Sequence, residues 1–478
     1  MLFNSINFAI FLPIVFILYW FFANKNLKLQ NLLILVASYY FYACWDWKFM
    51  FLLIFSTLLD YFTGLKMYES ENVYKRKFWF WLSIIVNLGL LGIFKYYNFF
   101  AKSFAEMIAN FGLQVNPWTL KVILPIGISF YTFHGLSYVI DIYKKRIPAE
   151  KSFIEYSVFV SFFPLLVAGP IERATHLLPQ IKVKRNFHYS KAVDGLRQIL
   201  WGLFKKIVIA DQCAIYANQI FNDFGNQSGS NLFLGALFFT FQIYGDFSGY
   251  SDIALGTARL FGIELLKNFA FPYFSRDIAE FWRRWHISLS TWFRDYLYIP
   301  LGGSKGSVWF KIRNTFIIFL VSGFWHGANW TFIAWGFLNA LFIMPSIIFN
   351  TNRNNLEIVA RGKYLPSIKE FLSIVITFSL TVFAWIFFRS SSIENAFLYL
   401  KKMFSETLFS IPTVKPLIVI FFIIFFMTIE WLGREEEFAL NKLGLNWSKI
   451  VRRGFYMLLI TAIFLFASKE QQFIYFQF

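Results

Sequence analysis

The chain has 478 residues, of which 58% are hydrophobic, 22% are aromatic and 15% are charged. Soluble domains usually carry about 25% charged residues, so this composition excludes an ordinary soluble globular protein. The formal net charge of +18 does not indicate nucleic-acid binding, because the Lys and Arg residues lie in short stretches between long apolar blocks. Cytoplasmic loops of membrane proteins gather basic residues in this pattern. We therefore expect an integral membrane protein, surrounded by lipid, that binds no nucleic acid.

The first third of the chain predicts five membrane crossings. The apolar blocks cover residues 7–23, 30–45, 48–65, 78–97 and 120–142. They approach the roughly 20 apolar residues that a transmembrane helix needs. Basic residues follow the first, third and fifth blocks, for example Lys25, Arg76 and Lys144. These loops should share the cytoplasmic side, which places the N-terminus on the extracytoplasmic side.

The next apolar block, residues 154–171, does not fit a simple crossing. A full crossing would place the basic stretch from Arg173 to Lys191 outside, against the usual distribution of positive charge. The block also ends in Ala168-Gly-Pro170, a sequence that breaks helices. We therefore expect a re-entrant or interfacial segment, in which irregular backbone is surrounded by protein or lines a water-filled cavity.

The rest of the chain predicts six more spans and one incomplete helix. The spans are residues 195–222, 231–255, 330–349, 370–390, 414–432 and 455–468. The basic, aromatic stretch 259–313 should form cytoplasmic amphipathic or re-entrant helices. Residues 314–324 would rise only about half the hydrocarbon thickness before Gly323 and Gly327 interrupt them. We expect one all-α polytopic domain with about 11 or 12 transmembrane helices, both termini extracytoplasmic, and its functional core within residues 120–350.

His326 is the first candidate for chemistry, because an ionisable side chain within a membrane is functional by default. Its ordinary pKa of about 6.5 suits proton transfer at neutral pH. The broken helix would place it near the middle of the membrane. The alternative interpretation is a structural histidine bonded to a neighbouring helix. No spacing of Cys and His predicts a metal site.

Residues beside His326 could serve the same reaction. Ser322 precedes it by four residues, so an acyl-serine intermediate is conceivable on a continuous helix. Direct attack by an acceptor hydroxyl, with His326 as the base, needs fewer groups and is the simpler hypothesis. A developing oxyanion could be stabilised by Trp325, by Asn329 or by a backbone N–H freed at the helix break.

His286 is the second candidate and follows a Trp-Arg-Arg-Trp run. On a continuous helix Trp282, Trp285 and His286 would share one face. Arg283 and Arg284 would then point elsewhere and could bind the phosphates of a donor. This pattern predicts a cytoplasmic mouth for an anionic, nucleotide-bearing ligand. The alternative is a belt of Trp and Arg side chains that anchors a helix among lipid headgroups.

Acidic residues also fall inside predicted spans, among them Asp60, Asp246 and Asp252. A buried carboxylate usually pairs with a cation or a helix end, so structural pairing is favoured over catalysis, with a proton path as the alternative. Asp246 is retained as a candidate for the lining of a substrate path. The remaining histidines are interpreted as polar groups at span ends and loops; they are His134, His176 and His188.

Longer motifs carry a resemblance to a known family. They are Leu124-Pro-Ile-Gly-Ile-Ser-Phe-Tyr-Thr-Phe133, Asp246-Phe-Ser-Gly-Tyr-Ser-Asp-Ile-Ala254, Trp282-Arg-Arg-Trp-His286, Tyr298-Ile-Pro-Leu-Gly-Gly303 and Ser322-Gly-Phe-Trp-His-Gly327. With them, nearly the whole chain resembles the membrane-bound O-acyltransferase family, in its bacterial alginate O-acetyltransferase-like branch. His326 matches the invariant histidine of the family, and His286 matches the second one. His134 departs from the pattern, at a position where a Gln is expected.

The resemblance implies a central tunnel through the bacterial cytoplasmic membrane. It implies an acyl thioester on the cytoplasmic side, acetyl-CoA or an acyl carrier, as donor substrate, with no bound cofactor. The acceptor would be a hydroxyl of an extracytoplasmic polysaccharide, reached directly or through a periplasmic or extracellular acetyltransferase partner. The alternatives are a D-alanyl transferase for teichoic acid and, from another class, a secondary transporter. The sequence shows no paired inverted repeats, which weighs against a transporter.

Overall fold

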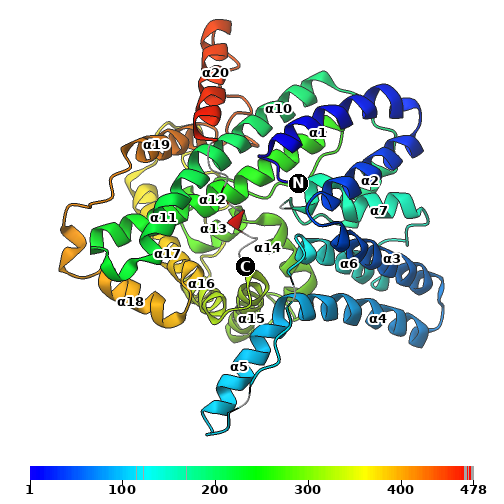
Figure 1. Ribbon diagram of the computed structural model, residues 1–478, viewed down its shortest axis with the longest axis horizontal. Helices are drawn as coiled ribbons and strands as arrows, with labels where there is room; N and C mark the ends of the chain where they lie inside the picture. The colour runs from blue at the N-terminus through cyan, green and yellow to red at the C-terminus, as the bar shows by residue number, and fades with distance from the viewer. Residues whose placement is uncertain (115, 122, 168, 468–470, 472, 475–478) are drawn as a thin grey trace. The chain divides into compact units, whose positions relative to one another are not determined.

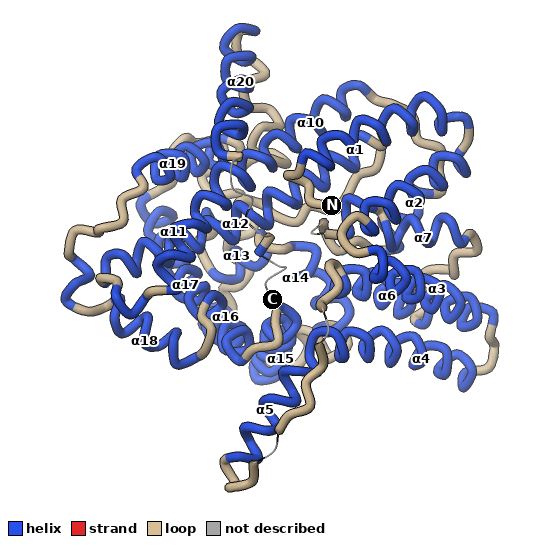
Figure 2. The backbone as a smooth tube through the Cα atoms, viewed as in Figure 1, coloured by secondary structure: helices blue, strands red, loops and turns tan. Residues whose placement is uncertain are grey.

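Helices joined by loops build the described part of the computed structural model (Figure 2). The structure describes residues 1–114, 116–121, 123–167, 169–467, 471 and 473–474. Within these residues there is no strand, which confirms the predicted all-α class.

The chain forms two compact units. Unit 1 comprises Met1–Ala192 and Ala258–Leu266, and unit 2 comprises Val193–Thr257 and Lys267–Phe478. All the site residues predicted from the sequence belong to unit 2. The single domain expected from the sequence stays a prediction.

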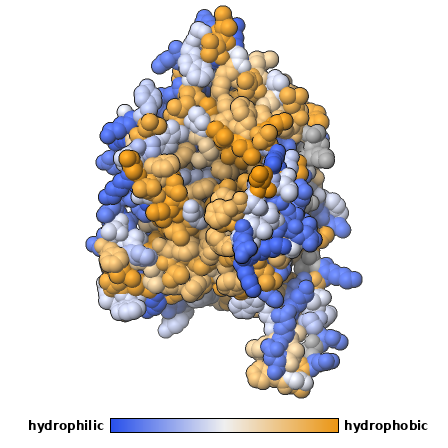
Figure 3. Space-filling model, turned by 90° about the vertical axis from the view of Figure 1, so that its left-hand side faces the viewer, coloured by the Kyte–Doolittle hydropathy of each residue, from blue (hydrophilic) through white to orange (hydrophobic). Residues whose placement is uncertain are grey.

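Several helices have the length and composition of membrane spans. Among the described residues they are Ile6–Lys25, Trp47–Glu69, Val73–Ala109, Trp330–Ile348 and Ile368–Arg389, with Leu417–Leu432 as a shorter apolar helix. Figure 3 shows hydrophobic residues spread over a broad part of one face. Such extended apolar surface is expected where lipid covers a protein. The chain is therefore a membrane protein with several apolar helices, and the larger predicted number of crossings stays a prediction.

The helices of unit 1 follow most of the predicted blocks. They are α1 (Ile6–Ile17), α2 (Leu27–Ala43), α3 (Trp47–Glu69), α4 (Val73–Leu91), α5 (Tyr97–Ala109), α6 (Ile128–Tyr143), α7 (Phe153–Ser161), α8 (Phe163–Leu166) and α9 (Ala174–Ile181). Among the described residues of the block 120–142, the helix begins at Ile128. The expected irregular segment 154–171 is split at Phe162 into two short helices. Ala168, part of its expected breaker, lies outside the described residues.

Polar side chains in unit 1 have structural partners. Asp60 of α3 accepts hydrogen bonds from Ser83 Oγ at 2.6 Å and from Asn87 Nδ2 at 2.7 Å, both on α4. His134 Nε2 accepts a hydrogen bond from the backbone N–H of Glu172 at 3.1 Å. Because buried polar groups are costly without such bonds, these contacts fix how the helices of unit 1 pack.

Unit 2 contains the other helices, among them the 32-residue α12 (Figure 1). They are α10 (Tyr189–Leu203), α11 (Asp211–Asn222), α12 (Gly229–Leu260), α13 (Ile278–Arg284), α14 (Ile287–Phe293), α15 (Val308–His326), α16 (Trp330–Ile348), α17 (Ile368–Arg389), α18 (Ile393–Met403), α19 (Leu417–Leu432) and α20 (Lys449–Phe466). Both α10 and α12 also include residues of unit 1. A π-helical turn, Phe204–Ala210, joins α10 to α11. The short helices α13 and α14 occupy the stretch that was expected to form amphipathic helices.

The prediction of a half-length helix at residues 314–324 is wrong, because α15 has 19 residues. At 1.5 Å per residue it measures about 28 Å, close to the full hydrocarbon thickness. Gly323 does not interrupt the helix but lets α16 approach, since a Cβ there would lie 2.2 Å from the Phe332 carbonyl oxygen. Gly336 of α16 stands in the same relation to the Phe319 carbonyl oxygen, also at 2.2 Å. The length of α15 therefore no longer supports a mid-membrane position for His326.

Candidate active site

His326 is the last residue of α15 and is held at a tight connection to α16. Gly327 follows it with extended backbone, and a Cβ at Gly327 would lie 2.1 Å from the Phe332 ring. Asn329 then starts α16, with its side chain accepting a hydrogen bond from the backbone N–H of Thr331 at 3.0 Å. This N-cap bond satisfies a free donor at the start of α16. The connection thus buries the His326 side chain, which is 3% exposed.

Aromatic rings surround the His326 imidazole. Its ring centroid lies 4.8 Å from Trp325, 5.1 Å from Trp335 and 5.5 Å from Phe388, all in edge-to-face arrangements. Trp335 in turn stacks on Trp385 at 5.5 Å. These rings come from α15, α16 and α17, so the packing of three helices orients the imidazole.

His286 lies in a turn rather than on a helix. The helix α13 ends at Arg284, Trp285 is extended, and His286 has a left-handed backbone with a φ of 43°. The prediction that Trp282, Trp285 and His286 share one helical face is therefore wrong. His286 is also fully buried, with 0% exposure, so the structure does not make it an open mouth.

The indole of Trp325 contacts both histidines. The Trp325 ring lies 6.1 Å from His286 and 4.8 Å from His326, centroid to centroid. The three residues come from two parts of the sequence, and folding brings them together inside unit 2. Both imidazoles are buried beside this indole and are therefore shielded from bulk water, which is a favourable surrounding for proton transfer.

The two tryptophans beside His286 pack into the same aromatic wall. Trp282 lies 5.7 Å from Trp335 and 5.2 Å from Phe319, and its indole N–H donates to Asn339 Oδ1 at 3.3 Å. Trp285 is buried and lies 5.2 Å from Trp385. Trp282 thus lies next to a ring that contacts His326, and Trp285 lies next to Trp385, which stacks on that ring. The helical reason given for the two tryptophans does not hold.

The two arginines of this run bind protein oxygens. Arg283 donates from Nη1 to the Asn352 carbonyl at 2.7 Å and from Nη2 to the Asn355 carbonyl at 2.8 Å. Arg284 Nη2 lies 2.8 Å from Glu280 Oε1 in an ion pair. These contacts hold the loop after α16 and the α13 helix. A phosphate-binding role for either arginine stays a prediction, and its guanidinium already has acceptors here.

The remaining candidates near His326 have defined positions. Ser322 is buried and stands one helical turn before His326 on the continuous helix α15. Besides capping α16, Asn329 donates from Nδ2 to the Ser391 carbonyl at 3.1 Å. The Asn329 amide therefore serves the connection between helices, whereas the role of Ser322 stays a prediction. Among the described residues, no group of His, Cys, Asp and Glu could hold a metal ion.

Asp246 has a cation as its partner. Lys206 Nζ lies 2.7 Å from Asp246 Oδ1 and 2.7 Å from Asp211 Oδ1, and all three side chains are buried. The backbone N–H of Ile474 donates to Asp246 Oδ2 at 2.7 Å. This arrangement matches the structural pairing that the sequence favoured for Asp246.

A second ion pair lies beside it. Lys205 Nζ lies 2.9 Å from Asp252 Oδ2 and 3.0 Å from Glu430 Oε1. Trp201 Nε1 donates to Glu430 Oε1 at 2.9 Å, and the Tyr244 hydroxyl donates to Glu430 Oε2 at 2.6 Å. The paired residues form what we call the buried charge cluster: Lys205, Lys206, Asp211, Asp246, Asp252 and Glu430. Sequence reasoning missed Lys205, Lys206, Asp211 and Glu430, although two adjacent lysines inside an apolar block were a visible signal.

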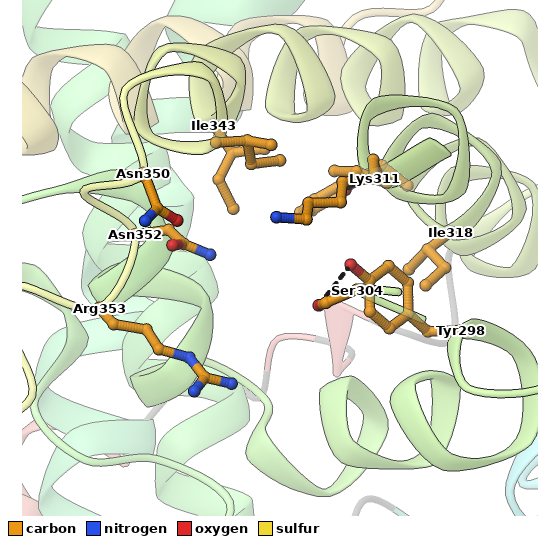
Figure 4. A pocket seen from close by; sticks show the side chains of 11 residues that line it. Tyr298, Ser304, Lys311, Ile318, Ile343, Asn350, Asn352 and Arg353 are labelled. Atoms are coloured by element: carbon orange, nitrogen blue, oxygen red, sulfur yellow. Dashed lines mark hydrogen bonds between the residues drawn. The ribbon is translucent and has the colours of Figure 1, made fainter. Parts of the chain in front are cut away.

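A separate opening in unit 2 has a cavity volume of about 550 Å³ (Figure 4). Lys311 of α15 points into it, and Arg353 lies across from it on the loop that Arg283 holds. No acidic side chain of the described residues lines it. Phe319, in its wall, is the ring that Trp282 contacts. Sequence reasoning missed this opening because its lining residues are spread over residues 298–319 and 343–353.

Comparison with known proteins places the chain among acyltransferases. The sequence pattern of the membrane-bound O-acyltransferase family matches residues 143–389, a range that contains both histidines of the site. A probable alginate O-acetylase of Pseudomonas aeruginosa is 41% identical over 85% of this chain and 75% of its own length. The peptidoglycan O-acetyltransferase of Helicobacter pylori is 34% identical over 100% of this chain and 98% of its own.

A more distant relative acts on another polymer. The teichoic acid D-alanyltransferase of Streptococcus thermophilus is 30% identical over 61% of this chain and 75% of its own length. The O-acetyltransferases thus match a larger share of this chain at higher identity. The chain belongs to the membrane-bound O-acyltransferase family and is an O-acyltransferase.

Proposed function

We propose that this protein moves an acetyl group from cytoplasmic acetyl-CoA, through the membrane, to a hydroxyl of an extracytoplasmic polysaccharide. The transfer is direct or passes through a partner protein. The observation that carries the chemistry is the pair of buried histidines around Trp325. The acetyl group is supported by relatives named for O-acetylation of alginate and of peptidoglycan, which align over most of the chain.

In this reaction His326 is the general base. One of its ring nitrogens takes the proton of the acceptor hydroxyl while the hydroxyl oxygen attacks the thioester carbonyl. The carbon–sulfur bond then breaks, and the leaving thiolate takes the proton back from the imidazolium. The products are the acetyl ester and free CoA. The rings of Trp325, Trp335 and Phe388 support this role, because they keep bulk water away from the thioester, which water would otherwise hydrolyse.

The opening in Figure 4 supports an entry for the donor. Its volume of about 550 Å³ lies within the range of small-molecule sites. Lys311 and Arg353 offer positive charge to the phosphates of acetyl-CoA. Lys311 and His326 stand 15 residues apart on α15, which is about 22 Å along the helix axis. An extended pantetheine arm is suited to a separation of this size.

A chain of rings supports the same route between these two positions. Phe319 in the wall of the opening contacts Trp282 at 5.2 Å, and Trp282 contacts Trp335 at 5.7 Å. Trp335 contacts the imidazole of His326 at 5.1 Å. An apolar path of this kind fits an uncharged acyl-pantetheine arm, whereas the charged nucleotide would stay at the opening.

Kinetics with the two basic residues removed test this entry. Lys311→Ala combined with Arg353→Ala should raise the KM for acetyl-CoA by roughly tenfold or more, since each charged hydrogen bond contributes about 1.5–3 kcal/mol. The control combines Lys305→Ala with Arg361→Ala, two exposed basic residues outside the opening. An unchanged KM in the first variant would exclude this opening as the phosphate site.

Labelled acetyl-CoA tests the reaction itself. Inside-out membrane vesicles with and without the protein are supplied with acetyl-labelled CoA, and the glycan fraction is assayed for label released by mild alkali. We expect protein-dependent ester label and release of free CoA. Ester label that appears only when a carrier protein charged with labelled D-alanine replaces acetyl-CoA would identify the D-alanyl transferase instead. Movement of a substrate without any covalent change would identify a transporter.

A further inference from the structure

Asn268 holds the side chain of His286 in place. Asn268 is 1% exposed and lies in the loop between α12 and α13. Its Oδ1 lies 3.0 Å from His286 Nδ1 and accepts a hydrogen bond from Ser288 Oγ at 2.9 Å. Its Nδ2 donates to Ser251 Oγ of α12 at 3.1 Å. The amide thus turns its carbonyl oxygen toward the imidazole and its nitrogen toward Ser251.

The backbone near Asn268 also restrains the turn that contains His286. The Asn268 carbonyl accepts a hydrogen bond from the Ile287 N–H at 2.9 Å, and the Ala270 N–H donates to the Arg284 carbonyl at 2.9 Å. Between these two bonds His286 has a φ of 43°, a left-handed conformation that side-chain-bearing residues rarely adopt. Such backbone persists only where surrounding contacts enforce it. Side chain and backbone of Asn268 therefore both determine where the imidazole lies.

This contact sets the tautomer of His286. A carbonyl oxygen only accepts hydrogen bonds, so the proton of the neutral imidazole is on Nδ1 and Nε2 carries a lone pair. His286 Nε2 is buried, and it has no hydrogen-bond partner within the described part of the chain. Buried polar atoms are usually satisfied, so Nε2 is an exception whose lone pair can still accept a hydrogen bond.

The imidazole is also kept neutral. His286 lies outside the helices that are long and apolar enough to span a membrane, and burial lowers its pKa below the ordinary value of histidine. Its ring neighbours are aromatic: Phe247 at 4.6 Å, Phe269 at 6.4 Å and Trp325 at 6.1 Å. A neutral imidazole with a free lone pair accepts a hydrogen bond but is a weak base.

We propose that Asn268 is a positioning residue that fixes His286 as the Nδ1–H tautomer, so that Nε2 accepts a hydrogen bond from an N–H or O–H group of a bound substrate. The inference rests on the proposed acyl transfer for its catalytic consequence. It assigns different tasks to the two histidines: His326 takes the proton, and His286 orients the substrate beside it.

Nitrogen NMR of the purified protein labelled with ¹⁵N-histidine tests the tautomer without any turnover. The signal of His286 is assigned by its loss in His286→Gln. In the wild type we expect a neutral imidazole protonated on Nδ1. In Asn268→Ala the proton should move to Nε2 or exchange between both nitrogens, whereas Asn268→Asp should restore Nδ1–H because its carboxylate oxygen also accepts. A wild-type imidazole protonated on Nε2 would overturn the proposal.

Turnover of labelled acetyl-CoA by the same variants tests the consequence. Asn268→Ala should lower kcat by at least about tenfold, in line with the loss of a residue that orients a catalytic histidine. Asn268→Asp should recover most of that loss. The matched control is Asn231→Ala, which removes another buried Asn from the far end of α12.

The two readouts separate two kinds of failure. A kcat for Asn268→Ala equal to that of the control, at equal melting temperature, would overturn the positioning role. If the wild type shows the Nδ1–H tautomer but no acetyl transfer to any glycan, the proposed function fails while the assignment of Asn268 to the tautomer stands.

Discussion

The two histidines around Trp325 and the buried charge cluster are both enclosed in unit 2, yet their surroundings are opposite. His326 and His286 contact aromatic rings, and His286 Nε2 has no hydrogen-bond partner among the described residues. In the cluster, Lys205 and Lys206 each lie within 3.0 Å of two carboxylates. Burial of an ionisable side chain therefore does not by itself indicate catalysis. Complete pairing indicates structure, and unused hydrogen-bonding capacity beside an aromatic wall indicates a site.

Removing His326, the proposed general base, should have the largest effect on activity. His326→Ala should lower acetyl transfer by about 10² to 10⁴-fold, the usual contribution of a general base. The measurement is release of free CoA from labelled acetyl-CoA by purified protein. His188→Ala, at an exposed position, is the control and should retain the wild-type rate. Wild-type turnover in folded His326→Ala protein would show that the aromatic surroundings of His326 do not mark the transfer site.

Breaking the buried charge cluster should act on stability first. Lys206→Ala leaves Asp211 and Asp246 without their cation, and such a loss typically costs about 3–5 kcal/mol. Denaturant unfolding in detergent measures the change in the free energy of unfolding. Lys305→Ala removes an exposed lysine and should change little. Adding Asp246→Asn to Lys206→Ala should recover part of the loss. Equal stability of the two lysine variants would contradict a structural role for the cluster.

The helix pair that carries His326 can be tested through its glycines. Gly323→Ala places a Cβ against the Phe332 carbonyl and should destabilise the protein by about 1–3 kcal/mol, with a loss of turnover as α15 and α16 separate. The matched control is Gly454→Ala on α20, where no heavy atom lies within 4 Å of the added Cβ. That variant should be neutral or stabilising by up to ~1 kcal/mol. Equal melting temperatures for the two variants would contradict the packing role of Gly323.

The smallest expected effect is at Asn329, where the test distinguishes a structural role as the N-cap of α16 from a role in catalysis. Asn329→Ala removes the N-cap of α16 and should cost about 1 kcal/mol of stability, with turnover reduced only as far as folded protein is lost. Asn329→Asp keeps an acceptor for the Thr331 N–H and should retain most of the stability. A fall in kcat well beyond the loss of folded protein would instead assign Asn329 to the oxyanion.

Long apolar runs were predictable from the sequence. The predicted span 330–349 corresponds to Trp330–Ile348, and 370–390 corresponds to Ile368–Arg389. Such runs are determined locally, because a helix satisfies all its backbone hydrogen bonds within one segment and its length follows from the apolar block. Prediction failed for α15, where Gly323 was interpreted as a break. Whether a glycine ends a helix or admits a neighbour depends on the packing of α16, which no local pattern records.

For the candidate site, too, some features were predictable from the sequence and others were not. By itself the sequence determined a helical membrane protein and two histidines worth testing, because composition, apolar block length and motif residues are local properties. Only the tertiary structure decided that Trp325 contacts both His326 and His286, that α13 stops at Arg284, and that Asn268 faces His286. These are contacts between segments distant in the chain, and they form only when whole helices pack and exclude water from the groups between them.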